Sequence, residues 1–187
     1  YRDFSPNFQA DVGFVVKNNR RWATLYHAYQ VFPNKPALQF LSFGTKADVL
    51  YTYEDYLKTI SVDAILSVKT LFNTEISYTL DFDAFKNFLG RDYRNLESNR
   101  FVIRSSPSES FALNLNFTVG RELAFNEAIP EKGKELTFNF IPLIQLSNKL
   151  RISPSIRYAR LKYLDSDNFY YNGSISRFSI RYQFNNF

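Results

Sequence analysis

The sequence contains neither cysteine nor methionine. Without cysteine, a disulfide framework, a thiol nucleophile and a thiolate metal site are excluded. No stretch approaches the roughly 20 consecutive apolar residues of a membrane-spanning helix, so a helical membrane protein is excluded as well. Because methionine is missing even from position 1, we expect the 187 residues to be a processed or partial piece of a longer chain.

Charge of one sign is not clustered either. The formal net charge is +5, but the basic residues are scattered among acidic ones. A nucleic-acid interface gathers lysine and arginine in one region, so we expect no nucleic-acid partner. Aromatic residues, in contrast, make up 18% of the chain, with 20 Phe and 13 Tyr, which is a heavy loading for a soluble domain.

Apolar and polar residues alternate over most of the chain. In RFSIRYQFNN (177–186), the even positions through 184 are apolar and the odd positions are polar. This period of two predicts a strand with one face in an apolar environment and the other in an aqueous one. The same pattern predicts strands at 21–32, 38–53, 60–68, 76–84, 98–105, 111–119, 136–144, 150–158 and 173–184.

The links between these strands alternate between short and long. Interleaving of this kind predicts successive antiparallel hairpins, with tight turns at one end and long loops at the other, as in up-and-down transmembrane barrels. A Greek-key sandwich has no reason to sort its loops in this way. The tight links are 32–37, 71–74, 105–110 and 146–149, and the long ones are 53–58, 86–98, 126–134 and 164–173.

The two faces of such a barrel have different expected surroundings. Aromatic residues near strand ends, such as Tyr78, Phe101 and Tyr158, predict girdles at the membrane boundary. In the last strand the predicted lipid-facing residues are Phe178, Ile180, Tyr182 and Phe184. A structural charge network is predicted to face the lumen, and it comprises Lys46, Asp48, Asp63, Lys69, Asp81, Asp83, Arg157, Arg177 and Arg181.

The predicted fold is therefore an all-β, antiparallel, up-and-down transmembrane barrel. Residues 1–187 form one barrel segment, in which 1–20 are a loop and 21–187 are strands. Pro142 and Pro154 lie inside two strands and predict bulges or gaps in the hydrogen-bond ladder. Nine strands is an odd number for a single-chain bacterial barrel, and Asn185-Asn186 is interpreted as a turn, so we expect a segment of a larger barrel.

The opening residues RDFSPNFQADVGFVVKNNRRW (2–22) resemble the first segment of an outer-membrane barrel domain of unassigned function. Residues 99–125 and 146–165 resemble its later strands and tight turns, although Ser5 stands where asparagine is usual. In that family the barrel follows a module similar to family-9 carbohydrate-binding domains in Gram-negative surface proteins. The resemblance implies an outer-membrane location and a glycan ligand bound through a module that is missing here.

No residue pattern predicts catalysis, a metal site or a cofactor. His27 is the only histidine, and a triad or zinc site needs partners, so a strand or girdle role is expected. Asp81 and Asp83, with Asp63, could form an acid/base pair or a cation site, but the charge network explains them equally. DSDN (165–168) has the composition of a calcium loop without its glycine and distal glutamate, and is interpreted as an exposed acidic loop.

The expected function is that of an outer-membrane surface protein. It would act as a pore, a nutrient-uptake accessory or an anchor for a carbohydrate-binding module, with lipid and other surface proteins as partners. One alternative is a soluble antiparallel barrel or sandwich that binds a ligand. Another is an outer-membrane hydrolase with a site in the lumen, which would need a nucleophile–base pair that the sequence does not display.

Overall fold

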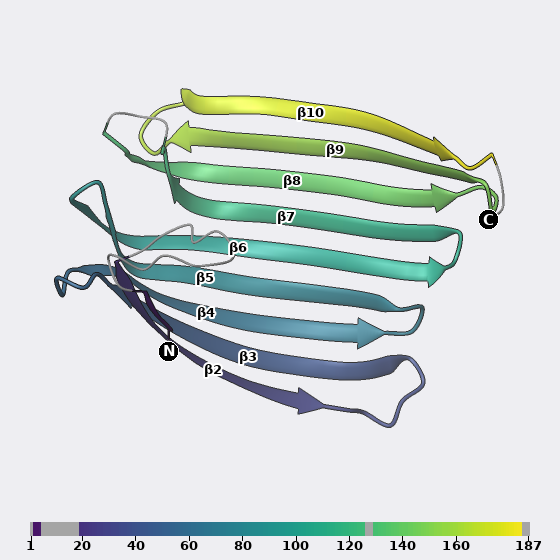
Figure 1. Cartoon of the computed structure of the whole chain (residues 1–187), viewed down its shortest axis with the longest axis horizontal. Helices are drawn as coiled ribbons and strands as arrows, with labels where there is room; N and C mark the ends of the chain where they lie inside the picture. The colour runs from purple at the N-terminus through teal and green to yellow at the C-terminus, as the bar shows by residue number, and fades with distance from the viewer. Residues whose placement is uncertain (1, 5–18, 126–128, 185–187) are drawn as a thin grey trace.

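A computed structural model describes residues 2–4, 19–125 and 129–184. These residues form one antiparallel sheet whose strands follow each other in chain order (Figure 1). The strands are β1 (Arg2–Phe4), β2 (Arg20–Val31), β3 (Leu38–Tyr51), β4 (Leu57–Thr70), β5 (Thr74–Phe88), β6 (Arg91–Ser108), β7 (Phe111–Leu123), β8 (Lys132–Gln145), β9 (Leu150–Tyr163) and β10 (Phe169–Tyr182).

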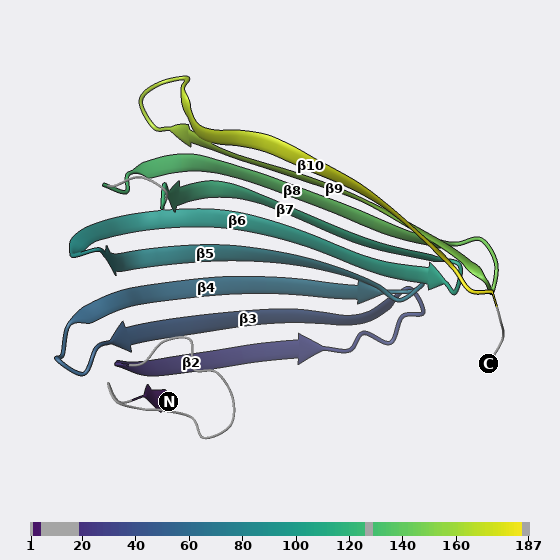
Figure 2. The ribbon, with the colours of Figure 1, turned by 45° about the horizontal axis from the view of Figure 1, so that its top comes forward.

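The predicted all-β, antiparallel, up-and-down order of strands is confirmed. Each of the nine predicted strands coincides with one of β2–β10, and every neighbour along the chain is an antiparallel partner. The described residues contain no apolar helix of membrane-spanning length. The sheet is curved but not closed (Figures 1 and 2). One edge consists of the short β1 and the part of β2 beyond it, and β10 forms the other edge.

The predicted contrast between short and long links does not hold, because the tight link 32–37 is longer than the links 52–56, 89–90 and 164–168 at the other end of the sheet, and only 124–131 exceeds it. The link predicted at 86–98 is wrong, because β5 and β6 continue through it and leave only Leu89 and Gly90 between them. Both residues have positive φ, 51° and 76°, as a two-residue type I′ hairpin turn requires. Leucine is rare in that conformation, so the local sequence does not signal the turn.

The segment predicted as a loop over 1–20 contains a short strand. Arg2 to Phe4 of β1 pair with Trp22 to Arg20 of β2. Residues 1 and 5–18 of the predicted loop, and the turn predicted at Asn185-Asn186, lie outside the described residues, and Arg20 is the first residue of β2. The outer edge of β2 from Ala23 to Val31 and the outer edge of β10 have no strand beside them in the described part of the chain.

The ladder gap predicted from the two prolines is confirmed. Pairing between β8 and β9 stops after Phe140–Ile156 and resumes at Ile144–Ile152 in the same register. Pro142 therefore lies opposite Pro154, and neither has an N–H group to donate. The Ser153 hydroxyl donates to the Pro142 carbonyl oxygen at 3.3 Å, which replaces one of the missing bonds.

A conventional core is nearly absent. Within the described residues the buried hydrophobic side chains are only Tyr93, Leu96, Leu123, Ala124 and Leu161. The sheet is a single layer, whereas a soluble domain buries its apolar face beneath a second layer. The apolar residues of the strands therefore project from one face of the sheet without a covering element.

Candidate functional site: the polar face of the sheet

The pairing register assigns each side chain to one of two faces. Directly paired residues share a face, and one continuous row runs Tyr26, Lys46, Asp63, Asp81, Ser98, Gly120, Glu135, Leu161 and Tyr171 from β2 to β10. We call the face that carries this row the polar face. All nine residues of the predicted charge network lie on it: Lys46, Asp48, Asp63, Lys69, Asp81, Asp83, Arg157, Arg177 and Arg181.

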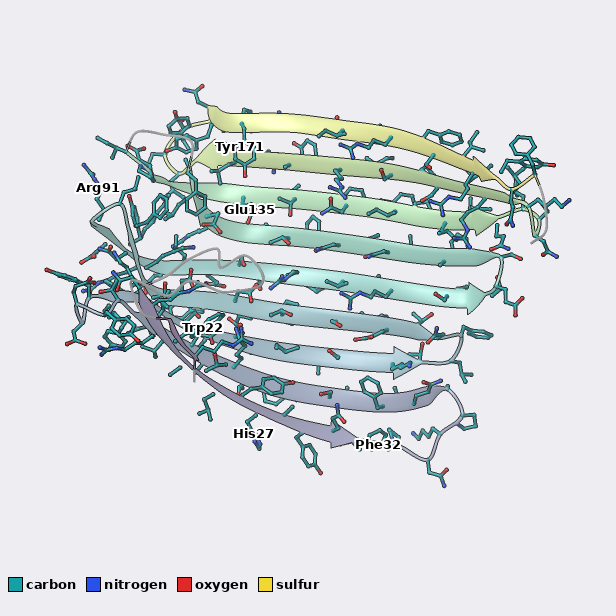
Figure 3. The ribbon with its side chains drawn as sticks, in the orientation of Figure 1. Trp22, His27, Phe32, Arg91, Glu135 and Tyr171 are labelled. Carbon is teal, nitrogen blue, oxygen red and sulfur yellow. The ribbon has the colours of Figure 1, made fainter. Side chains whose placement is uncertain are left out.

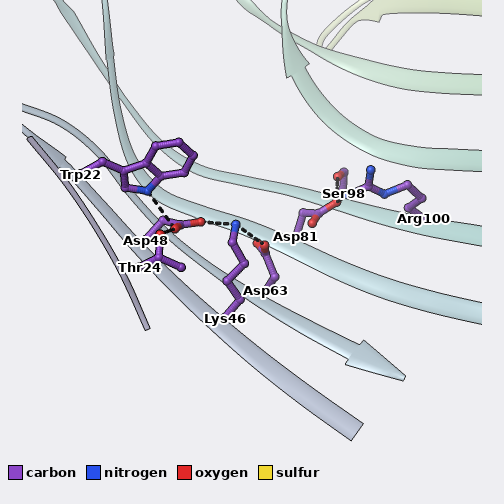
Figure 4. Close-up of polar contacts among 8 residues, drawn as sticks. All are labelled: Trp22, Thr24, Lys46, Asp48, Asp63, Asp81, Ser98 and Arg100. Atoms are coloured by element: carbon purple, nitrogen blue, oxygen red, sulfur yellow. Dashed lines mark hydrogen bonds and ion pairs between the residues drawn. The ribbon is translucent and has the colours of Figure 1, made fainter. Parts of the chain in front are cut away.

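The most extensive contacts on the polar face centre on Asp48 (Figure 4). The Trp22 indole Nε1 and the Thr24 hydroxyl donate to Asp48 Oδ1 at 2.9 and 2.6 Å. Lys46 Nζ forms an ion pair with Asp48 and lies 3.4 Å from Asp63 Oδ2. The Asp48 side chain is only 10% exposed, so its charge depends on these donors rather than on water.

Two further ion-paired groups continue the network across β5, β6 and β7. Arg100 Nη2 lies 2.8 Å from Asp81 Oδ2, to which the Ser98 hydroxyl also donates at 3.4 Å (Figure 4). Lys86 Nζ lies 3.3 Å from Asp83 Oδ2 and 3.6 Å from Glu122 Oε1. The carboxylates at Asp81 and Asp83 thus have separate cations, as a structural network requires.

The structure does not bring all predicted members together. Lys69 lies opposite Glu75 at the tight-turn end of β4, but forms no ion pair within the described residues. Arg157, Arg177 and Arg181 also lack an ion-pair partner there. Sequence reasoning missed Trp22, Thr24, Lys86, Ser98, Arg100 and Glu122, because their roles depend on cross-strand register, which no single strand encodes.

Replacing Lys46 with glutamine is expected to lower the free energy of unfolding by about 1–2 kcal/mol, because two poorly exposed carboxylates lose their shared cation. Guanidinium titrations of the folded protein in detergent, followed by the fluorescence of Trp22, the only tryptophan, would measure the change. Lys69→Gln is the matched control on the same face and should change stability by less than about 0.5 kcal/mol. Equal losses in the two variants would contradict the assigned network.

Metal ligands are not gathered on the polar face in the part of the chain that the structure describes. No group of three or more His, Asp or Glu side chains within the described residues is positioned to hold a metal ion. His27 belongs to β2 and pairs with Thr45, on the face opposite that of Lys46 and Asp48. Figure 3 shows it along the β2 side of the sheet. The arrangement offers charged and hydrogen-bonding groups along an extended wall, which suits contact with water and solutes.

The opposite face carries a row of aromatic side chains that the sequence pattern alone did not reveal. We call it the apolar face. The row consists of consecutive cross-strand partners from β2 to β9, of which seven are aromatic and one is a leucine: Tyr29, Phe43, Leu66, Tyr78, Phe101, Phe117, Phe138 and Tyr158. The rings of Tyr78 and Phe101 are 4.8 Å apart. Tyr78, Phe101 and Tyr158 lie inside their strands, so their predicted position near strand ends is wrong, because the strands extend further than predicted.

Three of the four residues predicted to face lipid lie on the apolar face of β10, and Phe184 follows the end of that strand. Phe178, Ile180 and Tyr182 pair with Pro154, Ile152 and Leu150 of β9. Phe178, Ile180, Tyr182 and Phe184 are 66%, 60%, 51% and 81% exposed. At least half of each of these four residues is therefore left uncovered by the described residues.

Two carboxylates in the links at the other end of the sheet have lowered pKa values. Asn19 Nδ2 lies 3.0 Å from each carboxylate oxygen of Glu54, and this hydrogen bonding holds the pKa of Glu54 below its usual range. In the DSDN loop, the hydrogen bond from Lys162 lowers the pKa of Asp167. Both carboxylates are bound by neighbouring side chains of the chain itself and remain charged at neutral pH.

Comparison of the chain with known protein families, with curated proteins and with solved structures finds no match.

Proposed function

We propose that the chain forms part of the wall of a transmembrane β-barrel in the outer membrane of a Gram-negative bacterium, with its apolar face toward lipid and its polar face toward an aqueous lumen. The observation that carries the proposal is the uncovered apolar face. Large side chains such as Leu25, Phe43 and Phe178 are 72%, 55% and 66% exposed. Contiguous apolar surface on this scale marks contact with a membrane or another protein.

The length of the strands supports lipid as that partner. Strands β2–β10 contain 12 to 18 residues. A tilted strand needs roughly 9 to 11 residues to cross a bilayer, whereas strands of soluble proteins usually contain about 5 to 6. A spanning wall would use this length fully, while a soluble sheet would have no need of it.

The edges of the sheet constrain how the wall closes. Strands β2 and β10 run in the same direction, because an even number of antiparallel steps separates them (Figure 1). Unpaired backbone groups are costly in lipid, so both edges must find strand partners. Closure through antiparallel pairs alone requires an odd number of strands between β10 and β2, and the short β1, which already pairs with the first residues of β2, counts as one of them.

Among the roles open to such a barrel, the polar face favours a pore. Its ion pairs and hydroxyl groups form a surface that water can wet, as in barrels with an aqueous channel. The resemblance of residues 2–22 to a barrel domain of surface proteins favours the same location. Nutrient uptake and the display of a carbohydrate-binding module are the further roles that this resemblance implies.

Single-cysteine labelling tests the proposal directly, because the chain has no cysteine of its own. Nitroxide labels at Val62→Cys and Leu66→Cys would report the apolar face of β4, and labels at Ser61→Cys and Ser67→Cys the polar face. In phosphatidylcholine vesicles, the first pair should be relaxed mainly by oxygen, which concentrates in lipid. The second pair should be relaxed mainly by a water-soluble nickel chelate.

The labelling result separates the membrane barrel from a soluble sheet. In a soluble barrel or sandwich, the labels at 62 and 66 would be shielded from both reagents, since a second layer would cover them. Protein that stays monomeric in water without detergent, and whose labels at 62 and 66 are relaxed by neither reagent, would refute the proposed function.

A further inference from the structure

Four arginines lie on the polar face of β9 and β10. Arg151 and Arg181 are direct cross-strand partners, and Arg157 and Arg177 occupy neighbouring rungs of the same ladder. From Arg151 to Arg157 the strand advances about 20 Å, at roughly 3.3 Å per residue. We call these four residues the arginine strip.

The arginine strip has no neutralising acid nearby on its own face. Within the described residues, the polar face of β9 and β10 holds no carboxylate, and the closest one on β8 is Glu135, which lies opposite Leu161. That rung is four residues, or about 13 Å along the strand, from Arg157. This separation exceeds the screening length of about 8 Å at physiological ionic strength.

Like charges in direct cross-strand positions destabilise a sheet. Arg151 and Arg181 are such a pair, and the only described side-chain contact of Arg151 is a bond from Nη2 to Gln145 Oε1 at 3.3 Å. Elsewhere on the polar face, cations alternate with acids, as at Asp48, Lys46 and Asp63. The strip is therefore a local excess of positive charge and not a part of the balanced network.

A hollow lies beside Arg157, at one end of the arginine strip. Its floor is a rung of small residues, Thr137, Ala159 and Gly173, which pair across β8, β9 and β10. Arg157 and Asn139 form one side and Tyr171 lines the hollow from the adjacent rung, around a volume of about 520 Å³. A Cβ atom placed on Gly173 would meet no atom within 4 Å, so the space above it is open.

We infer that the arginine strip draws small anions through the lumen and delivers them to the hollow beside Arg157. This inference rests on the proposed function. The guanidinium groups attract carboxylate and phosphate groups, which they bind with two hydrogen bonds each. Arg157 and Asn139 supply charged and neutral donors at the hollow, and the open floor accommodates the remainder of a small solute.

Ion selectivity of the full-length protein in planar bilayers tests this inference. Under a KCl gradient, the reversal potential of the native channel should have the sign of preferential chloride passage. The double variant Arg151→Gln/Arg181→Gln should reduce the chloride-to-potassium permeability ratio by about threefold, equivalent to about 0.65 kcal/mol. A single Arg177→Gln variant should shift the ratio in the same direction by a smaller amount.

Two matched variants distinguish the strip from charge in general. Arg121→Gln/Arg160→Gln removes the same charge from the apolar face of β7 and β9. Because that face lies outside the proposed lumen, the permeability ratio should stay unchanged. Arg151→Lys/Arg181→Lys keeps the charge and should keep the chloride preference. Channels whose selectivity is the same in all variants would overturn the arginine strip while leaving the pore intact. A protein that forms no channel in any variant would overturn the proposed function, and the strip with it.

Discussion

Leu66→Arg is expected to lower the free energy of unfolding in a bilayer by about 2–4 kcal/mol, the cost of placing arginine on the lipid face of a barrel near the membrane midplane. Leu66 is 42% exposed and lies near the middle of β4, between Phe43 and Tyr78 in the aromatic row. In water, a substitution at so exposed a position would change stability by no more than about 0.5 kcal/mol. The variant therefore distinguishes lipid from water as the medium on this face.

Ser67→Arg supplies the matched control, because it introduces the same side chain one residue further along β4, on the polar face. It should be tolerated within about 1 kcal/mol, since the arginine would meet water and the hydroxyl of Ser77. Guanidinium titration of both variants in phosphatidylcholine vesicles measures the difference. If Leu66→Arg proved as stable as Ser67→Arg in lipid, the proposed orientation of the sheet would be wrong.

Gly120→Ala is expected to destabilise the protein by about 3 kcal/mol through steric overlap. A Cβ atom on Gly120 would lie 2.3 Å from the Glu97 carbonyl oxygen and 2.4 Å from Ser98 Cα. Both are backbone atoms of β6, so the overlap can be relieved only by separating β6 from β7. Separation would weaken the ladder around the Ser98–Gly120 pair.

Gly173→Ala is the appropriate control for this effect, because it adds the same methyl group in β10, where no atom lies within 4 Å of the new carbon. It should change stability by less than about 0.5 kcal/mol. Thermal unfolding monitored by circular dichroism in detergent would compare the two variants. Similar midpoints for Gly120→Ala and the unsubstituted protein would show that β6 and β7 are not held as closely as described.

Alternation along the chain was sufficient to predict the strands and their two faces. The reason is that successive side chains of an extended strand point to opposite faces. The alternation of apolar and polar residues in a run such as 76–84 therefore indicates both a strand and its two different faces. The links were also informative where asparagine, proline and serine provided turn chemistry. Both kinds of information are local, which is why they could be obtained from single segments.

The contacts of the polar face could not be predicted in the same way. Whether Asp48 meets Trp22 and Lys46 depends on the register between β2, β3 and β4, which is set by pairing over whole strands. A β-bulge between Ile60 and Ser61 further changes which residues of β4 and β5 oppose each other. The turn at Leu89–Gly90 escaped prediction because its first residue is a leucine with positive φ.

The opposed prolines of β8 and β9 have a consequence for how these strands select their alignment. In the native register Pro142 and Pro154 share one rung, so their missing donors interrupt the ladder at a single place. Any slipped alignment would place them on different rungs and interrupt the ladder twice, and in the proposed lipid surroundings each unsatisfied group would cost several kcal/mol. Two residues that each weaken the sheet thus together favour the native register, because they destabilise misaligned β8–β9 hairpins more than the correctly aligned one.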